Sequence, residues 1–354
     1  MRIGNIFSKS GRYATGVSLG SSAIKIVELQ RSSNSWQLLH FGIVQLPEDA
    51  ILNRDIVNHL AVVDKMRALV SEIRLNQRSV CTSVSGNGVI IKRLNIEIEN
   101  KNELDEQVSW EAEHYLPFDP SEVYLDYSVV SESSAGVADV ILVAVKQSLM
   151  DSYVGCIEDA GLKVEVLDID FFALQNVYEA NYTPQSGQAV CLVDIGAAST
   201  KMVVVFNGIP IFTKESAIGG MTLTREIEKT LSLSYSDAEA IKVGSQSGSG
   251  GPQEVKELIN IMNENISSEI RRTIDFYSAS SSGGPVSQIL ITGGGSKLDG
   301  LVNTVGAVTE ISTSHLNPFV NVSYDSSRFS SEEIQSIAPL ASICVGQALR
   351  QGEQ

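Results

Sequence analysis

Cysteine, histidine and long apolar runs are scarce in this chain of 354 residues. Its four cysteines and four histidines are scattered, with no CxxC pair and no spacing typical of a zinc site. The sequence therefore predicts reduced, packed cysteines and no bound zinc. No apolar run approaches the roughly 20 residues of a membrane-spanning helix, and the basic first dozen residues lack the apolar core of a secretion signal. We expect a cytoplasmic chain without a transmembrane segment.

Basic residues are also in the minority. The chain holds 26 Lys and Arg against 42 Asp and Glu, a net charge of −16, which disfavours a polyphosphate backbone and hence nucleic acid as a partner. Hydrophobic residues make up 43% of the chain, which excludes the disordered class. At about 100 to 200 residues per domain, the length suits two lobes.

An internal repeat is the most informative feature that is present. Residues Val17–Val27 align with Val193–Val203 at a constant offset of 176. Each copy is a β-rich apolar run, a tight turn of small residues entered through Gly20 or Gly196, and a second β-rich run, which is the pattern of a hairpin. Two such hairpins at the starts of two similar halves predict a duplicated α/β fold whose halves face each other across a cleft.

Changes of pattern along the chain divide it further. Helical spacing at 57–74 and a strand at 80–84 complete a first α/β unit, and the strands and helices of 85–165 have the pattern of an inserted subdomain. A Gly- and Ser-rich loop at 244–252 is typical of a flexible, solvated stretch. The predicted parts are a flexible basic N-terminus at 1–12, a first lobe core at 13–84 and 166–188, an inserted subdomain at 85–165, a second lobe core at 189–218 and 278–354, and a second-lobe subdomain at 219–277.

The two turns are candidate half-sites for phosphate. The glycine that opens each turn permits a backbone geometry in which consecutive amides point inward at an anion. Hydroxyl donors follow in both copies, from Ser21 and Ser22 and from Ser199 and Thr200. Asp194, at a strand end, is placed to hold a magnesium-bound water. The simpler alternative is a tight hairpin with Asp194 capping its turn, but the repetition of the pattern favours phosphate binding.

A third candidate element suits a nucleoside. Gly293, Gly294 and Gly295 follow an apolar strand, where a chain without side chains lets a flat ligand lie against the backbone. Glu239 and Lys242 share one helix face within reach of ribose and base edges, although a solvated ion pair is the simpler explanation of that pair alone. The P-loop and Rossmann glycine motifs are absent from the sequence.

This order of elements resembles the superfamily of actin, the heat-shock chaperone ATPases and the sugar kinases, whose paired phosphate hairpins, two connecting helices and adenosine turn hold ATP in a cleft. The inserted region resembles the 1C subdomain of the FtsA and PilM branch. Several segments are similar to the PilM family of type IV pilus assembly proteins, namely Gly16–Leu29, Glu111–Phe118, Glu122–Tyr127, Glu269–Thr273 with Phe276 and Tyr277, and Ile291–Gly295. The resemblance implies a duplicated actin-like, ribonuclease H-like two-lobed ATPase fold with an inserted 1C-type subdomain.

The resemblance also implies ATP and Mg²⁺ as cofactors. The residues that we expect around them are Gly20, Ser21, Ser22, Lys25, Asp194, Gly196, Ala197, Ala198, Ser199, Gly219, Gly220, Glu239, Lys242, Gly293, Gly294 and Gly295. Ser18 departs from the family pattern, which has Asp at the start of the first hairpin. Losing one charge-assisted hydrogen bond costs about 1.5 to 3 kcal/mol, roughly tenfold to a hundredfold in affinity. Hydrolysis needs a metal-stabilised leaving charge, so we expect ATP binding with weak or no ATPase activity.

An acidic helix in the inserted region is the candidate partner surface. Residues 97–113 hold seven acids and one lysine, with apolar residues at helical spacing. A solvated helix face is the simpler explanation, but the resemblance makes this region one wall of a groove for the N-terminal peptide of a PilN-like inner-membrane protein. It points to Tyr115, Pro117 and Phe118 as contacts and to other cytoplasmic pilus components as further partners, and it leaves self-association open.

The leading hypothesis is a cytoplasmic ATP-binding scaffold of the type IV pilus assembly platform, peripheral to the inner membrane through a partner. An FtsA-like division protein is one alternative, although the last residues lack the apolar stripe of an amphipathic anchor. A small-molecule kinase with Asp168 or Asp170 as base is another, although both aspartates serve equally well as helix caps.

Overall fold

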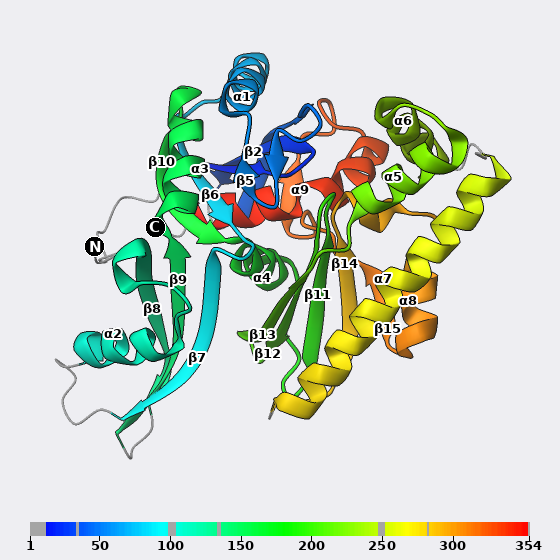
Figure 1. Cartoon of the computed structure of the whole chain (residues 1–354). Coiled ribbons are helices and arrows are strands. Elements are labelled where there is room, and N and C mark those ends of the chain that lie inside the picture. Colours follow the sequence, from blue (N-terminus) through cyan, green and yellow to red (C-terminus); the bar gives the residue numbers. More distant parts are fainter. Residues whose placement is uncertain are drawn as a thin grey trace.

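The computed structural model describes residues 12–32, 35–97, 104–132, 136–246, 252–281 and 283–352. It is organised by two large β-sheets, one in each lobe (Figure 1). The predicted N-terminal segment, except for Arg12, lies outside the described residues, as do 247–251 of the predicted loop and 98–103 of the acidic stretch. No helix in the described part of the chain is both long enough and apolar enough to span a membrane.

The first lobe is built on a six-stranded sheet. Its order is β10-β6-β1-β2-β3-β16, in which β1, β2 and β3 are antiparallel neighbours and the remaining strands join in parallel. The strands are β1 (Tyr13–Leu19), β2 (Ala23–Ser32), β3 (Ser35–Gln45), β6 (Ser79–Val84), β10 (Lys163–Ile169) and β16 (Val322–Tyr324). A small hairpin, β4 (Ile51–Leu52) and β5 (Asp55–Ile56), follows β3.

The second lobe repeats this topology in a five-stranded sheet of order β13-β12-β11-β14-β15. Its strands are β11 (Ala189–Ile195), β12 (Thr200–Phe206), β13 (Ile209–Ser216), β14 (Val286–Thr292) and β15 (Ser312–His315). The register is repeated as well, because Ser18 pairs with Lys25 in the first hairpin and Asp194 pairs with Lys201 in the second. The duplicated α/β fold that the sequence predicts is confirmed.

The insertion between β6 and β10 has a sheet and a small core of its own. The sheet has the order β7-β9-β8, and Leu104, Val108 and Ala112 of the adjoining helix α2 are buried in this core. The elements are β7 (Val89–Glu97), α2 (Leu104–Tyr115), the 3₁₀ turn η2 (Pro120–Glu122), β8 (Val123–Glu132) and β9 (Val137–Lys146). Two further helices, α1 (His59–Ile73) and α3 (Gln147–Asp159), pack together beside the first sheet.

Helices cover the second sheet on the side away from the insertion (Figure 1). The helix pair at the top of this lobe and the long helix beside it enclose a core of aliphatic side chains. These elements are α5 (Gly220–Leu231), α6 (Tyr235–Gln246), α7 (Gln253–Ser280), the 3₁₀ turn η3 (Gly294–Lys297) and α8 (Leu301–Thr309).

Two helices, α4 (Asp170–Asn181) and α9 (Ser331–Gly352), pack on each other and contact both large sheets. The sequence-based boundary placed 278–354 in the second lobe, but β16 joins the first sheet and α9 lies across β1 and β2. The close approach depends on glycine, since a Cβ at Gly16 would lie 1.9 Å from the Cys344 carbonyl oxygen. From Ala341 to Leu349 every residue of α9 is buried, as expected for a helix enclosed on several sides.

Candidate functional site

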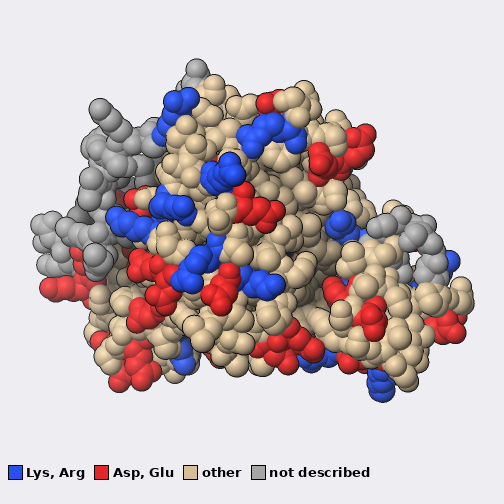
Figure 2. Space-filling model, turned by 90° about the horizontal axis from the view of Figure 1, so that it is seen from above, with Lys and Arg blue, Asp and Glu red and all other residues tan. Residues whose placement is uncertain are grey.

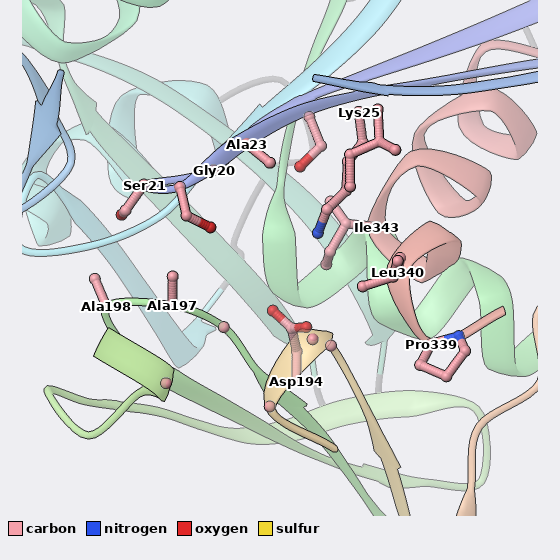
Figure 3. Close-up of a pocket in the computed structure, with 18 of the residues that line it drawn as sticks. Gly20, Ser21, Ala23, Lys25, Asp194, Ala197, Ala198, Pro339, Leu340 and Ile343 are labelled. Atoms are coloured by element: carbon pink, nitrogen blue, oxygen red, sulfur yellow. The ribbon is translucent and has the colours of Figure 1, made fainter. Parts of the chain in front are cut away.

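Two turns of small residues face each other between the lobes. The Gly20 amide donates to the Ala23 carbonyl at 3.0 Å, and the Gly196 amide donates to the Ser199 carbonyl at 2.9 Å. The two turns therefore close in the same way. Figure 3 shows the first turn, labelled at Ser21, on the opposite side of the cavity from the second. The sequence repeat is thus also a repeat in three dimensions.

Close contact, rather than an unusual backbone conformation, explains the glycine at the entry of each turn. Neither Gly20 nor Gly196 has a positive φ, so the conformational argument made from the sequence does not hold. A Cβ at either position would lie 3.1 Å from the carbonyl oxygen that closes its own turn. Glycine keeps both turns tight because a larger residue would push this carbonyl away.

The cavity between the lobes is lined by residues from both turns and from the elements around them. Of the residues predicted from the sequence, it brings together Gly20, Ser21, Ser22, Lys25, Asp194, Gly196, Ala197, Ala198, Gly220, Glu239, Lys242, Gly293, Gly294 and Gly295. Ser199 and Gly219 adjoin the second turn without lining the cavity.

The cavity is cationic although the chain is acidic. Five basic side chains line it, Lys25, Arg54, Lys201, Lys242 and Lys297, against the three acidic ones of Asp170, Asp194 and Glu239. On the outer face seen in Figure 2, by contrast, Lys and Arg are interspersed with Asp and Glu and form no continuous basic band. The charge distribution therefore suits a small anionic ligand in the cavity and does not suit a nucleic acid on that face.

The hydroxyl groups of the two turns differ in their availability. Ser21 Oγ is buried and has no hydrogen-bond partner among the described residues. Ser199 Oγ donates to Glu215 Oε1 at 2.6 Å, and Thr200 Oγ1 donates to the Ile218 carbonyl at 2.7 Å. The hydroxyls predicted as donors in the second turn are thus occupied within the protein. The Ser21 hydroxyl, which has no partner among the described residues, is the one of the three that is available to a group in the cavity.

A buried lysine links the second hairpin to α4. Lys201 Nζ lies 3.0 Å from Asp194 Oδ2 and 3.2 Å from Asp170 Oδ2. Burial raises the pKa of Asp170, but the charges of Lys201 and Arg54 and a hydrogen bond from Ser83 outweigh it and lower this pKa to about 2. No side chain caps α4, so Asp170 is an ionised partner of Lys201 rather than a helix cap.

Neither aspartate is suited to the role of a kinase base. A carboxylate with a pKa of about 2 takes a proton poorly near neutral pH, which disfavours Asp170. Asp168 does not line the cavity, and its Oδ1 accepts a hydrogen bond from its neighbour, the Ile169 amide, at 2.8 Å. Burial raises the pKa of Asp168 to about 6, in a position where its proton cannot reach a ligand in the cavity.

The first hairpin lacks the ion pair of the second. Ser18 occupies the position of Asp194, so Lys25, the counterpart of Lys201, faces a hydroxyl. Among the described residues the Lys25 ammonium has no ion-pair partner, and Figure 3 shows this side chain reaching into the cavity opposite Asp194. The same substitution that removes a carboxylate from the site therefore leaves a cation free to contact an anion.

The start of α5 supports the second turn from behind. The amides of Gly220 and Met221 donate to the carbonyls of Gly196 and Ala197, at 2.9 and 2.8 Å. Gly219 packs so closely that a Cβ there would lie 2.4 Å from the Ala197 carbonyl oxygen. The turn is therefore held against a helix N-terminus, whose partial positive charge favours an anion nearby.

Glu239 and Lys242 are not the solvated surface pair that is the simpler interpretation of the sequence. Lys242 is buried, and its Nζ lies 2.6 Å from Glu239 Oε2. The same Nζ donates to Thr224 Oγ1 at 2.8 Å and to the Gly220 carbonyl at 3.2 Å. The pair thus fastens α6 to the start of α5 and brings Glu239 to the cavity wall.

The glycine turn after β14 packs directly on the end of β11. A Cβ at Gly293 would lie 2.4 Å from the Ile195 carbonyl oxygen, and one at Gly295 would lie 2.3 Å from Ile195 Cγ2. Gly293 also has a φ of 87°, and its amide donates to the Pro339 carbonyl at 2.8 Å. These glycines are needed for packing between β11 and α9, in addition to their place on the cavity wall.

Three basic residues that line the cavity were not predicted from the sequence, namely Arg54, Lys201 and Lys297. Lys201 had a readable signal, because it aligns with Lys25 in the repeat. Lys297 lies two residues after the glycine turn, and no motif in the sequence marks it as a ligand-binding residue. Arg54 lies between β4 and β5 without any motif, and only the tertiary structure brings it to the cavity.

The predicted partner residues lie at and below the junction of the insertion with the first lobe. Lys146, which ends β9 and precedes α3, has its ammonium 4.3 Å from the centroid of the Phe118 ring. Tyr115 and Pro117 are exposed, and Trp110 of α2 is 61% exposed. Trp110 and Tyr115 are therefore exposed aromatic side chains at the C-terminal half of α2, and the half-buried Phe118 follows them along the chain.

The donor set of the cavity fits Mg²⁺ only in a largely hydrated form. Among the described residues, no cluster of three or more His, Cys, Asp or Glu side chains could hold a metal ion. One oxygen of Asp194 is engaged by Lys201. Mg²⁺ usually keeps several waters and binds one or two carboxylates together with ligand phosphates. Asp194, as a single carboxylate acting through water, is consistent with this coordination.

The duplicated sheets, facing turns and connecting helices define an actin-like ATPase fold. Within that class, the family model described as type IV pilus assembly protein PilM matches residues 16–352, and the chain belongs to this family.

Solved structures and curated proteins that are similar to this chain include a PilM, an MreB and an FtsA. The structure of a PilM-PilN type IV pilus biogenesis complex is similar with a TM-score of 0.86 at 28% identity, covering 96% of this chain and 99% of that chain. MreB 5 of Spiroplasma citri bound to AMPPNP shares the fold, with a TM-score of 0.52 at 9% identity over 95% and 94% of the two chains. Cell division protein FtsA of Escherichia coli strain K12 is 29% identical over 154 residues, 42% of this chain and 36% of FtsA.

Proposed function

We propose that this protein is an ATP-binding scaffold of the type IV pilus assembly platform, on the cytoplasmic side of the inner membrane. Membership of the PilM family supports the role in pilus assembly. The single observation that carries ATP binding is the pair of facing turns with an unpartnered Ser21 hydroxyl and a free Lys25 ammonium in one cavity. Both features suit a polyphosphate, which accepts hydrogen bonds and neutralises a cation.

In this proposal the two turns hold the phosphates, and Glu239, Lys242 and the turn of Gly293–Gly295 receive the nucleoside. The positions of these residues on one cavity wall support the assignment. Asp194 would hold Mg²⁺ through water, and the metal would neutralise phosphate charge. With Ser18 and Lys25 in place of a second carboxylate, we expect binding without fast hydrolysis, because the leaving charge has less metal support.

The partner in this proposal is the N-terminal peptide of a PilN-like inner-membrane protein. The similarity to the PilM-PilN complex supports it, as do the exposed aromatic side chains Trp110 and Tyr115 of α2. Nucleotide bound between the lobes fixes their relative angle, and that angle would set the width of the peptide site at the junction. The protein would thereby report its nucleotide state to the membrane platform and to other cytoplasmic pilus components.

Calorimetric titration with MgATP tests the nucleotide site. Lys25→Gln removes a cation that has no ion-pair partner among the described residues, so the expected effect is a loss of about tenfold to a hundredfold in affinity without unfolding. Lys65→Gln, on the exposed face of α1, is the matched control and should bind like the unchanged protein. Equal MgATP affinity for Lys25→Gln and the control would rule out the proposed phosphate contact.

A titration with synthetic N-terminal peptides of PilN-like proteins, with and without MgATP, tests the scaffold role. We expect saturable binding whose affinity depends on nucleotide. Absence of binding in both conditions would leave the partner assignment unsupported. A panel of sugars and carboxylates incubated with ATP should give no phosphorylated product, and any such product would favour a kinase instead.

A further inference from the structure

Arg54 ties the two lobes together at the edge of the cavity. It lies in the tight turn between β4 and β5 of the first lobe, where Asn53 and Arg54 both have a positive φ, of 50° and 76°. Two successive residues with positive φ are typical of the tight two-residue turn of a hairpin. The guanidinium reaches the second lobe, and only 13% of the side chain is exposed.

The partners of Arg54 belong to the second phosphate turn and the strand behind it. Its Nη2 donates to Ser199 Oγ at 2.7 Å and to Glu215 Oε1 at 2.9 Å, and Ser199 Oγ donates to the same carboxylate oxygen at 2.6 Å. Glu215 Oε2 is buried and has no partner among the described residues. The ion pair is therefore incomplete, since the described residues use neither the second carboxylate oxygen nor most of the guanidinium donors.

The unused part of the guanidinium is available to the cavity. Arg54 lines the cavity together with Ala197 and Ala198 of the second turn, whereas its partners Ser199 and Glu215 do not. A guanidinium presents five N–H donors in a planar fork that matches phosphate oxygens, and the contacts with the second lobe use only Nη2. An anion in the second turn would thus compete with Glu215 for the same cation.

We propose that Arg54 senses the terminal phosphate of the nucleotide. This inference rests on the proposed ATP site and specifies how that site distinguishes a triphosphate from a diphosphate. With ADP, Arg54 stays paired with Glu215 and Ser199 across the lobes. With ATP, the guanidinium turns to the terminal phosphate, which then becomes the link between the lobes. The lobe connection therefore depends on the length of the phosphate chain.

The experiment compares ATP and ADP affinities by calorimetry on the full chain, with Mg²⁺ present. Arg54→Gln should weaken ATP binding about tenfold to a hundredfold and change ADP binding by less than about threefold. Glu215→Gln weakens the competitor for Arg54, so it should strengthen ATP binding several-fold and raise the ratio of ATP to ADP affinity. Opposite effects from the two members of one ion pair are the signature of sensing.

A merely structural tie between the lobes would behave differently. Both variants would then lower the affinities for ATP and ADP by similar factors. That result would overturn the inference about Arg54 without contradicting the proposed ATP site. Failure of the unchanged protein to bind either nucleotide would overturn the ATP site as well. Arg225→Gln is the control, because Arg225 approaches Asp49 across the lobes at 3.9 Å without lining the cavity. If Arg54→Gln does not fold, Arg54→Lys must still lower the ATP to ADP affinity ratio, since it keeps the charge and loses the fork.

Discussion

Gly219 offers a direct test of whether the second turn binds the nucleotide. Its φ of −155° and ψ of 177° are extended values that any residue adopts, so Gly219→Ala causes no backbone strain of its own. The added Cβ, however, would lie 2.4 Å from the Ala197 carbonyl oxygen and 2.7 Å from the Ala198 carbonyl carbon. Ordinary contact begins at 3.4 Å, so the backbone of the turn must retreat by roughly 1 Å.

A displacement of this size changes the amides that the turn presents. The carbonyls of Gly196 and Ala197 are held by the start of α5 at 2.9 and 2.8 Å, so the turn can move only by stretching these bonds. Misplacing a binding group by about 1 Å is costly, and one lost charge-assisted bond is worth about 1.5 to 3 kcal/mol. We therefore expect the MgATP dissociation constant of Gly219→Ala to rise about tenfold to a hundredfold.

Calorimetry with MgATP measures the effect, and thermal unfolding by circular dichroism confirms that the variant folds. The matched control is Gly155→Ala, in the interior of α3, where an added Cβ meets nothing within 4 Å. This control should bind MgATP normally and gain about 0.5 to 1 kcal/mol of stability from better helix propensity. A folded Gly219→Ala protein that keeps the unchanged dissociation constant would refute the assignment of the second turn to phosphate.

Three further predictions concern stability and the partner surface. Gly346→Ala would place a Cβ 1.9 Å from the Ala173 carbonyl oxygen, so urea unfolding should reveal a loss of about 3 kcal/mol or no stable fold; an unchanged midpoint would contradict the packing of α4 on α9. Burial raises the pKa of Asp168 to about 6, so this group stabilises the fold most below about pH 4 and loses its contribution as pH rises through about 6. Asp168→Asn should therefore remove up to about 3 kcal/mol of pH dependence between pH 4 and 7, measured by urea unfolding, and parallel profiles would contradict the buried environment. Tyr115→Ala should lower the affinity for the PilN-like peptide without changing the affinity for MgATP. An unchanged peptide affinity would show that the peptide does not bind at this end of α2.

Local patterns in the sequence were sufficient for the repeated units of the fold. The alternation of apolar residues and the small-residue turns at Gly20 and Gly196 depend on neighbours within a few positions, and the offset between the copies is visible without a structure. The same locality explains why the lining by Ser21, Asp194 and Gly293–Gly295 could be predicted. Each of these residues lies at or just after the end of a strand, and Asp194 and Gly293–Gly295 follow the neighbouring parallel strands β11 and β14, whose ends meet at one edge of the second sheet. Ser21 lies in the first sheet, and the repeat predicts that its turn faces the second one.

Contacts between distant parts of the chain were beyond such patterns. The return of α9 to the first sheet depends on the fit of Gly16 against the Cys344 carbonyl, and nothing near either residue predicts it. The sequence also explained only part of the reason for glycine at 293 and 295. These positions exclude a side chain because they pack on Ile195, in addition to lining the cavity.

The sequence by itself determined the duplicated sheets and the two turns, because these follow from local periodicity and from the repeated spacing. It also indicated the family, through the resemblance of several segments to known proteins. Only the tertiary structure decided which charges meet. It paired Lys201 with both Asp194 and Asp170 and brought Arg54 across the lobes to Glu215, and within the described part of the chain it placed no carboxylate in an ion pair with Lys25. Electrostatic partners are set by distance in space rather than by separation along the chain, so the chemistry of the cavity emerges only when the lobes are folded together.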